Sequence, residues 1–308
     1  MAMDTPPGDT MLTELRVFLT QAITLALAVA GDDSAWNTPW AHSTAGRELA
    51  AEEARRPAPG TGSWPWLTAP MIARWSLQVA AAQATGFSAT LGPGATSYAA
   101  DVLCRGVLET SSLAWWLLDP DIGAGQRLAR SLVYRLHSAS HTERAINALE
   151  LGPEDNRAEY GELPGDVRQD IEGAGLTWEW RKRDGRRVLC CGEEPWLSYT
   201  ERAARLVEKI WPQRNLAYAV LSAVAHGELL GLQRNLVQSP PGTPGLRVAP
   251  DPATDSWLWQ DTYLVLGALV FSADRAAAFL GLDEQLAALH ALTGQLDERL
   301  PALRPGMA

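Results

Sequence analysis

Apolar residues recur every three or four positions over most of the chain, and this spacing places them on one face of an α-helix. Residues that stop helices bound these segments, as Asp119-Pro120 and Gly152-Pro153 each follow a long apolar period. Pro212 stands where the first turn of a helix accepts proline. The pattern predicts helices over residues 12–30, 70–86, 96–118, 128–149, 199–210, 212–236, 255–280 and 283–300.

Two segments break the helical period. Between residues 32 and 70, tryptophans alternate with prolines and glycines, which predicts a long Trp-rich loop with a short helix near 45–55. Between 176 and 190, two short runs flank Asp184-Gly185, a dipeptide typical of a tight β-hairpin turn. Because indole rings are costly to leave in water, we expect the loop to cover the helical core through Trp36, Trp40, Trp64 and Trp66.

The predicted fold class is therefore mainly all-α, a multi-helix bundle with a small β-hairpin inserted at about 176–191. Three regions follow from the breaks in the pattern. The first is an N-terminal helix with its Trp-rich cover, residues 1–69. A helical core spans 70–238, and C-terminal helices over 253–308 are expected to pack on that core.

Composition describes a soluble globular protein, with 46% hydrophobic and 20% charged residues. Glu14, Arg16 and Gln21 interrupt the first apolar segment, so we expect a core helix and no membrane contact, with a secretory signal as the alternative. Three cysteines without disulfide or zinc spacing are typical of the reducing cytoplasm. The formal charge of -10 repels phosphate at long range, so any contact with nucleic acid must be local.

Arg105 and Glu109 stand four residues apart on one predicted helix, so their side chains share a face. Ser112 and Trp116 continue the same stripe. A charged pair within an apolar helix is costly unless both groups are satisfied. Two interpretations stay open. The pair is either a structural ion pair, or a carboxylate base beside a cation that recognises phosphate or carboxylate.

A second polar stripe runs along the helix predicted after Pro212. Its members are three or four residues apart, which places them on one side: Asn215, Tyr218, Ser222 and His226. In one interpretation His226 is a core histidine bonded to a carbonyl oxygen. In the other it transfers a proton during catalysis, because an imidazole titrates near neutral pH.

Two motifs carry a family resemblance: Arg105-Gly-Val-Leu-Glu109 followed by Trp115-Trp-Leu-Leu-Asp-Pro120, and Tyr218-Ala-Val-Leu-Ser-Ala-Val-Ala-His-Gly227. They resemble helix signatures of uncharacterised bacterial proteins akin to the HEPN superfamily, over residues 70–236. The resemblance implies an all-α bundle that is often a dimer. Its active members are metal-independent ribonucleases of toxin–antitoxin and phage-defence systems, so the expected partners are RNA, an antitoxin or other protein, and a second copy.

The sequence departs from the family's catalytic motif, in which a histidine follows an arginine by four to six positions. Here His226 lies twelve positions after Arg214, and Ser222 stands one turn before His226, where an arginine is expected. Metal-free RNA cleavage needs a base, an acid and a cation. Glu109, His226 and Arg105 supply these types, with Ser222 beside them. The alternative function is a non-catalytic interaction or ligand-binding protein in which these residues form a buried network.

The predicted hairpin concentrates positive charge, with Trp178 and Trp180 before it. Such a cluster with aromatic neighbours is a candidate nucleic-acid contact. A solvated turn, or a surface for an acidic partner, is the alternative. The five basic residues in seven positions are Arg181, Lys182, Arg183, Arg186 and Arg187.

The sequence predicts no metal site and no cofactor. His137 and His141 share a helix face, yet two ligands without a third do not form a zinc site. The chain has no phosphate-binding glycine loop, no dinucleotide fingerprint and no nucleophile elbow.

Overall fold

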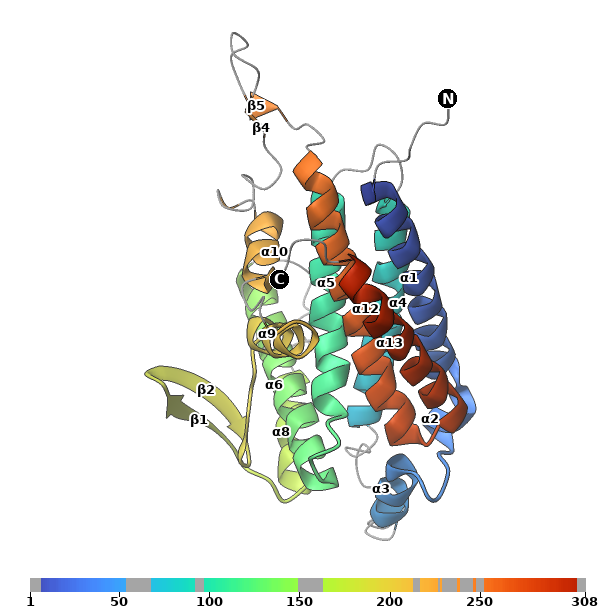
Figure 1. Ribbon diagram of the computed structural model, residues 1–308. Coiled ribbons are helices and arrows are strands. Elements are labelled where there is room, and N and C mark those ends of the chain that lie inside the picture. Colours follow the sequence, from blue (N-terminus) through green and yellow to red (C-terminus); the bar gives the residue numbers. More distant parts are fainter. Residues whose placement is uncertain are drawn as a thin grey trace, which may run out of the picture.

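The computed structural model describes residues 7–53, 68–91, 97–148, 163–212, 217–226, 228, 237–238, 246–247 and 252–303. Of these residues, 79% are helical (Figure 1). The helices are α1 (Pro7–Gly31), α2 (Asp33–Asn37), α3 (Thr44–Glu53), α4 (Thr68–Thr90), α5 (Ser97–Leu117), α6 (Ala124–Ala148), α8 (Leu163–Gly173), α9 (Tyr199–Ile210), α10 (Ala217–Ala225), α12 (Pro252–Leu280) and α13 (Asp283–Leu303). The strands are β1 (Trp178–Arg183), β2 (Arg186–Cys191), β3 (Glu194–Pro195), β4 (Val237–Gln238) and β5 (Leu246–Arg247).

The long helices α1, α4, α5 and α12 lie side by side and form the body of the molecule (Figure 1). Helices α4 and α5 pack closely at two glycines, since a Cβ on Gly106 of α5 would lie 2.9 Å from Nε2 of Gln83 on α4, and one on Gly86 of α4 would lie 3.7 Å from the side chain of Leu103 on α5. Small side chains allow two helices to approach closely. One continuous apolar core joins residues of α1, α4, α5, α6, α9, α12 and α13.

Helices α6, α8, α9 and α10 complete the bundle around α5 (Figure 1). Strands β1, β2 and β3 form an antiparallel sheet in that order, and the β1–β2 hairpin projects away from the helices (Figure 1). Its turn has positive φ at both central residues, 49° at Asp184 and 79° at Gly185. Positive φ at both positions is the property of the tight hairpin turn that this dipeptide favours.

The mainly helical fold class with a β-hairpin is confirmed. Helices α5, α6 and α9 begin and end within a few residues of their predicted bounds, because stops such as Asp119-Pro120 act locally. Helices α2 and α8 and strand β3 are short elements that the apolar pattern does not predict.

The prediction of one long helix over 212–236 is wrong. Pro212 lies in a turn after α9, and α10 ends at Ala225, with His226 in the turn that follows. The backbone N–H of Glu228 returns to the carbonyl of Ala223 at 2.9 Å, a bond that closes many helix ends. The sequence has a glycine at 227, the residue type that such ends prefer, so a local signal accounts for the end of α10, and residues 229–236 lie outside the described residues.

The prediction that the Trp-rich loop covers the helical core is correct for one tryptophan and wrong for another. Trp36 is buried, and its indole N–H donates to the carbonyl of Val29 at 2.9 Å. Trp40 keeps 60% of its surface exposed, because it stands in a short turn before α3 whose only ring neighbour among the described residues is His42. Trp64 and Trp66 lie outside the described residues.

The apolar period that predicts α4 does not face the core. Trp75 and Val79 are 55% and 46% exposed, whereas Leu77 and Phe87, on another side of the helix, are fully buried. Helix α4 thus has an exposed apolar side in addition to its buried one.

Two helices are long and apolar enough to cross a membrane by composition alone, over Leu12–Gly31 and Leu258–Leu280. The core helix of a soluble protein passes the same test, and 67% of the second window is buried inside the fold.

Candidate functional site

A polar cluster joins the middle of α5 to the end of α10. It consists of Arg105, Glu109, Tyr218 and His226. Arg105 and Glu109 lie one turn apart on α5, while Tyr218 lies in the first turn of α10 and His226 lies in the turn just after its end. Helices α5 and α10 pack against each other, so residues 121 positions apart in the chain come into contact.

Glu109 and His226 are both bonded to Arg105. The Nε of Arg105 donates to Oε1 of Glu109 at 2.7 Å, and its Nη1 lies 3.2 Å from Nε2 of His226. Because a guanidinium has only donors, Nε2 of His226 is the acceptor, and the neutral ring carries its proton on Nδ1. The cluster therefore holds a carboxylate, a cation and an imidazole in one connected set.

The hydroxyl of Tyr218 also donates to Oε1 of Glu109, at 2.6 Å. Burial raises the pKa of Tyr218 to about 12, and the hydrogen bond to Glu109 acts in the same direction. Burial opposes the charge on Arg105, but the hydrogen bond to Glu109 and its negative charge outweigh burial and raise the pKa of Arg105. Both partners of Glu109 thus keep their protons at neutral pH.

The cluster is partly accessible. The side chains of Arg105 and Glu109 are 20% and 24% exposed, and His226 is exposed. Both described contacts to Glu109 go to Oε1, and Oε2 receives no hydrogen bond from the residues that the structure describes. The four side chains are therefore ordered by one another and remain partly open to solvent.

Three of the four predicted catalytic residues come together, Arg105, Glu109 and His226. Ser222 is half-buried on α10, and within the described part of the chain its hydroxyl makes no hydrogen bond to these three. Asn215 lies outside the described residues. Tyr218 belongs to the predicted polar stripe, but sequence reasoning missed it as a site residue. The available signal in the sequence was that Tyr218 precedes His226 by eight residues, which places both on one side of a helix.

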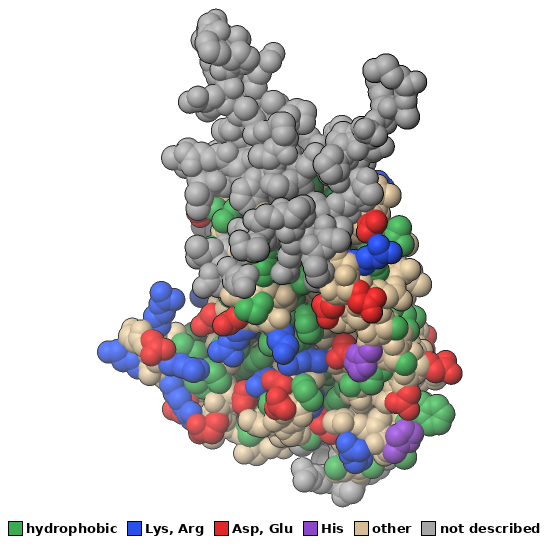
Figure 2. Space-filling model, viewed as in Figure 1, with side chains coloured by type: hydrophobic (Ala, Val, Ile, Leu, Met, Phe, Trp, Pro, Cys, Tyr) green, Lys and Arg blue, Asp and Glu red, His purple; other side chains and the backbone are tan. Residues whose placement is uncertain are grey.

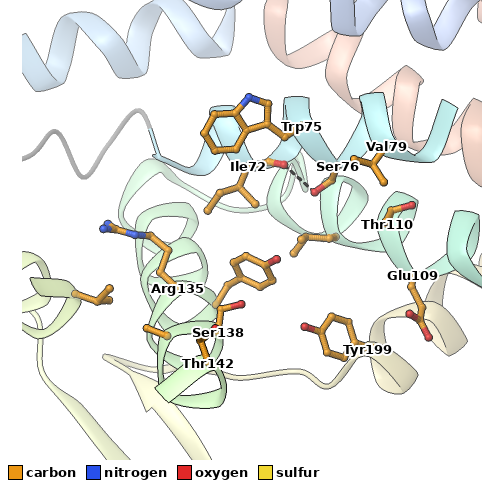
Figure 3. A pocket seen from close by; sticks show the side chains of 14 residues that line it. Ile72, Trp75, Ser76, Val79, Glu109, Thr110, Arg135, Ser138, Thr142 and Tyr199 are labelled. Atoms are coloured by element: carbon orange, nitrogen blue, oxygen red, sulfur yellow. Dashed lines mark hydrogen bonds between the residues drawn. The ribbon is translucent and has the colours of Figure 1, made fainter. Parts of the chain in front are cut away.

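Glu109 also lines a cavity of about 630 Å³ bounded by α4, α5, α6, α8 and α9 (Figure 3). Helix α4 forms one wall, with buried Ile72 and exposed Trp75 and Val79, and Tyr199 lies on the opposite side (Figure 3). Arg135 and Glu109 lie at opposite ends of this view. No pattern in the sequence predicts this cavity, because five separate helices contribute residues to it.

A buried arginine lies behind this cavity. Arg202 is fully buried, and its guanidinium carbon is 4.8–5.9 Å from the centroids of four aromatic rings, those of Trp116, Tyr134, Trp196 and Tyr199. Its Nη1 donates to the carbonyl of Leu197, while Nε and Nη2 have no hydrogen-bond partner among the described residues. Burial lowers the pKa of Arg202 to about 10, so the group stays charged at neutral pH.

The basic hairpin has two parts. Arg181 is bonded to Glu179 at 2.6 Å and to Glu193 at 2.8 Å, which neutralises it. Beyond Arg181, the antiparallel register places Arg183 opposite Arg186 and Lys182 opposite Arg187. These four side chains are exposed and form no ion pair with any described residue. Like charges directly across a hairpin repel each other, so an anionic partner would relieve this end.

The two histidines on α6 have separate surroundings. His137 stacks on Trp196 with 4.1 Å between ring centroids, and His141 is exposed. Within the described ranges, no group of three or more His, Cys, Asp or Glu residues is arranged to hold a metal ion.

Comparison of the chain with models of protein families, with curated proteins and with solved structures gave no match. The fold and the site therefore define the class directly: a helical protein with an accessible acid–base cluster beside an open, largely apolar cavity.

Proposed function

We propose that the chain is a HEPN-like, RNA-directed protein that cleaves RNA without a metal ion. The observation that carries the proposal is the position of Arg105, which is bonded both to Glu109 and to His226. Metal-free cleavage needs a base, an acid and a cation around one phosphate. The alternative of a sealed structural network receives less support, because Glu109 lines a cavity and His226 is exposed.

In the proposed reaction, Oε2 of Glu109 takes the proton of a ribose 2′-hydroxyl. The 2′ oxygen then forms a bond to phosphorus, and the bond from phosphorus to the 5′ oxygen breaks. His226 acts in its protonated form, in which Nε2 carries a proton and no longer accepts from Arg105, and gives that proton to the leaving oxygen. Arg105 stabilises the charge that develops on the phosphoryl oxygens. The products are a 2′,3′-cyclic phosphate and a 5′-hydroxyl.

The basic hairpin is proposed as a second RNA contact. Its cations concentrate locally in a chain of net charge -10 and form a group at one edge of the molecule (Figure 2). Trp180 is 49% exposed, and Arg187 stacks on it at 5.5 Å. A free indole face beside several cations suits single-stranded RNA, whose bases stack on aromatic rings. A cytoplasmic location, which the cysteine pattern predicts, and a dimer, which the family resemblance implies, belong to the same proposal.

The test incubates the purified chain with total RNA and with transfer RNA, with and without a chelator. We expect cleavage that survives chelation. His226→Ala and Glu109→Gln are expected to slow it by about 10²-fold or more, because each removes one partner in proton transfer. A sizing measurement on the same sample tests for the dimer.

His141→Ala is the matched control, since His141 is also an exposed histidine in a helical region and lies outside the cluster. It is expected to leave cleavage unchanged. Because His226 is exposed, its substitution is expected to leave the melting temperature within about 2 °C of the unaltered protein. Intact RNA with the unaltered protein, or cleavage that persists in His226→Ala, would refute the proposal.

A further inference from the structure

Exposed apolar side chains gather around the cavity beside Glu109. Trp75, Val79 and Tyr199 are 55%, 46% and 42% exposed, and all three line it. Soluble proteins rarely expose large apolar side chains on one concave surface unless something binds there. A volume of about 630 Å³ is in the range of small-molecule sites.

Polar groups at two ends of the cavity are already held in place. Arg135 is bonded through Nη1 to Asp170 at 2.7 Å, which leaves further N–H donors on its guanidinium. Glu109 is held through Oε1 by Arg105 and Tyr218, and Oε2 remains as an acceptor. Such groups fix the orientation of a ligand at little entropic cost.

The charge around the cavity favours an anion. Glu109 is neutralised by Arg105, and Asp170 by Arg135. Arg202, behind the rings of Tyr134 and Tyr199, adds a buried positive charge with no carboxylate within 4.0 Å among the described residues. A buried charge that lacks a counter-ion acts strongly on its surroundings, because little water screens it.

We infer that this cavity binds a planar aromatic acid, with its rings between α4 and Tyr199 and its acidic group at Arg135. A hydrogen-bond donor on the ligand meets Oε2 of Glu109. This site takes a small molecule and shares Oε2 of Glu109 with the proposed RNA cleavage, so binding is measured in the absence of RNA.

The test titrates the full chain with two fluorescent probes that share one ring system. One is 6-anilinonaphthalene-2-sulfonate, which carries an N–H donor and an acid at opposite ends of its naphthalene ring. The other is N-phenyl-2-naphthylamine, which carries the same donor without the acid. We expect the sulfonate to bind saturably at one site per chain. Arg135→Gln is expected to weaken sulfonate binding by about tenfold and to leave the uncharged probe unaffected, while Arg135→Lys restores most of the affinity.

Val79→Trp fills the mouth of the cavity and is expected to abolish binding of both probes. Val17→Trp is its control, since Val17 is an equally exposed valine, 56% accessible, on α1. Ser138→Trp, from the α6 wall, is a second filling variant should the first be misfolded.

Sulfonate binding that survives both filling variants, or that is spread over many sites, would overturn the cavity as the site. If Arg135→Gln weakened the binding of both probes equally, the proposal that an acidic group binds at Arg135 would be overturned. Neither result bears on RNA cleavage, which is measured separately with His226→Ala.

Discussion

At the scale of single residues, His137 shows how burial turns a histidine into a pH-sensitive element. Its ring stacks on Trp196, and its Nδ1 is buried without a hydrogen-bond partner among the described residues. Burial lowers the pKa of His137 to about 4, and the nearby charges of Arg144, His141 and Arg202 act in the same direction. The unfolded chain binds a proton at this residue below about pH 6.5, whereas the folded chain does so only near pH 4.

We therefore expect His137 to destabilise the fold as the pH falls from 6.5 to 4, by about 1–3 kcal/mol at the acid end. His137→Phe keeps the stacked ring and removes the proton-binding group. In urea denaturation at pH 7.0 and pH 4.5, the variant should lose less free energy of unfolding than the unaltered protein. His141→Gln, at an exposed position, should keep the full loss, and equal acid sensitivity of His137→Phe and the unaltered protein would contradict the assignment.

At the scale of elements, the hairpin differs from the helices because positively charged side chains lie opposite one another near its turn. The strands hold Arg183 opposite Arg186 and Lys182 opposite Arg187, and the turn at Asp184-Gly185 fixes that register. Repulsion across these pairs is a local cost that an anionic partner would remove. Arg181, one pair further from the turn, already has its partners in Glu179 and Glu193.

This difference gives a matched test of nucleic-acid binding. Replacing Arg183, Arg186 and Arg187 with Ser should weaken binding of single-stranded RNA and flatten its dependence on salt by about two units of slope at most, since each lost phosphate contact on a single strand removes about 0.7. Arg181→Ser should have little effect, because that charge is already neutralised. Filter-binding measurements from 50 to 300 mM salt distinguish the triple variant from Arg181→Ser. Equal effects of the two changes would argue against a nucleic-acid contact at this end.

At the scale of the whole molecule, close packing of distant helices decides which substitutions the fold tolerates. A Cβ on Gly267 of α12 would lie 2.5 Å from Cγ2 of Ile210 on α9. Ile210 is itself buried, so it has little room to move. Gly294 of α13 has nothing within 4 Å of the same position.

The two glycines should therefore respond to alanine in opposite directions. Gly267→Ala is expected to destabilise the fold by about 1–3 kcal/mol through overpacking. Gly294→Ala should stabilise it by about 0.5–1 kcal/mol, because alanine favours a helix over glycine. Thermal and urea denaturation of both variants give the comparison. A stabilised Gly267→Ala would mean that α9 and α12 lie further apart than the structure has them.

The sequence is sufficient to predict which residue pairs of the candidate site share a helix face, but it does not predict the cavity beside them. The spacing of four between Arg105 and Glu109, and of eight between Tyr218 and His226, is enough to place each pair on one helix face. The cavity is not predictable, because Trp75 and Val79 have the period of a core face and are exposed all the same. Arg202 has no distinguishing signal in the sequence either, since its aromatic neighbours come from α5, α6, α9 and the segment before α9.

The helical segments, their stops and the hairpin turn follow from the amino-acid sequence alone, because these features depend on residues within one or two turns of one another. Tertiary packing, in contrast, determines which face of α4 is buried and which side chains meet across α5 and α10. The second outcome depends on contacts between segments more than 100 residues apart, as the contact between Arg105 and His226 at a separation of 121 residues illustrates. Local periodicity carries no information on such contacts, since many pairings of amphipathic helices bury the same apolar area.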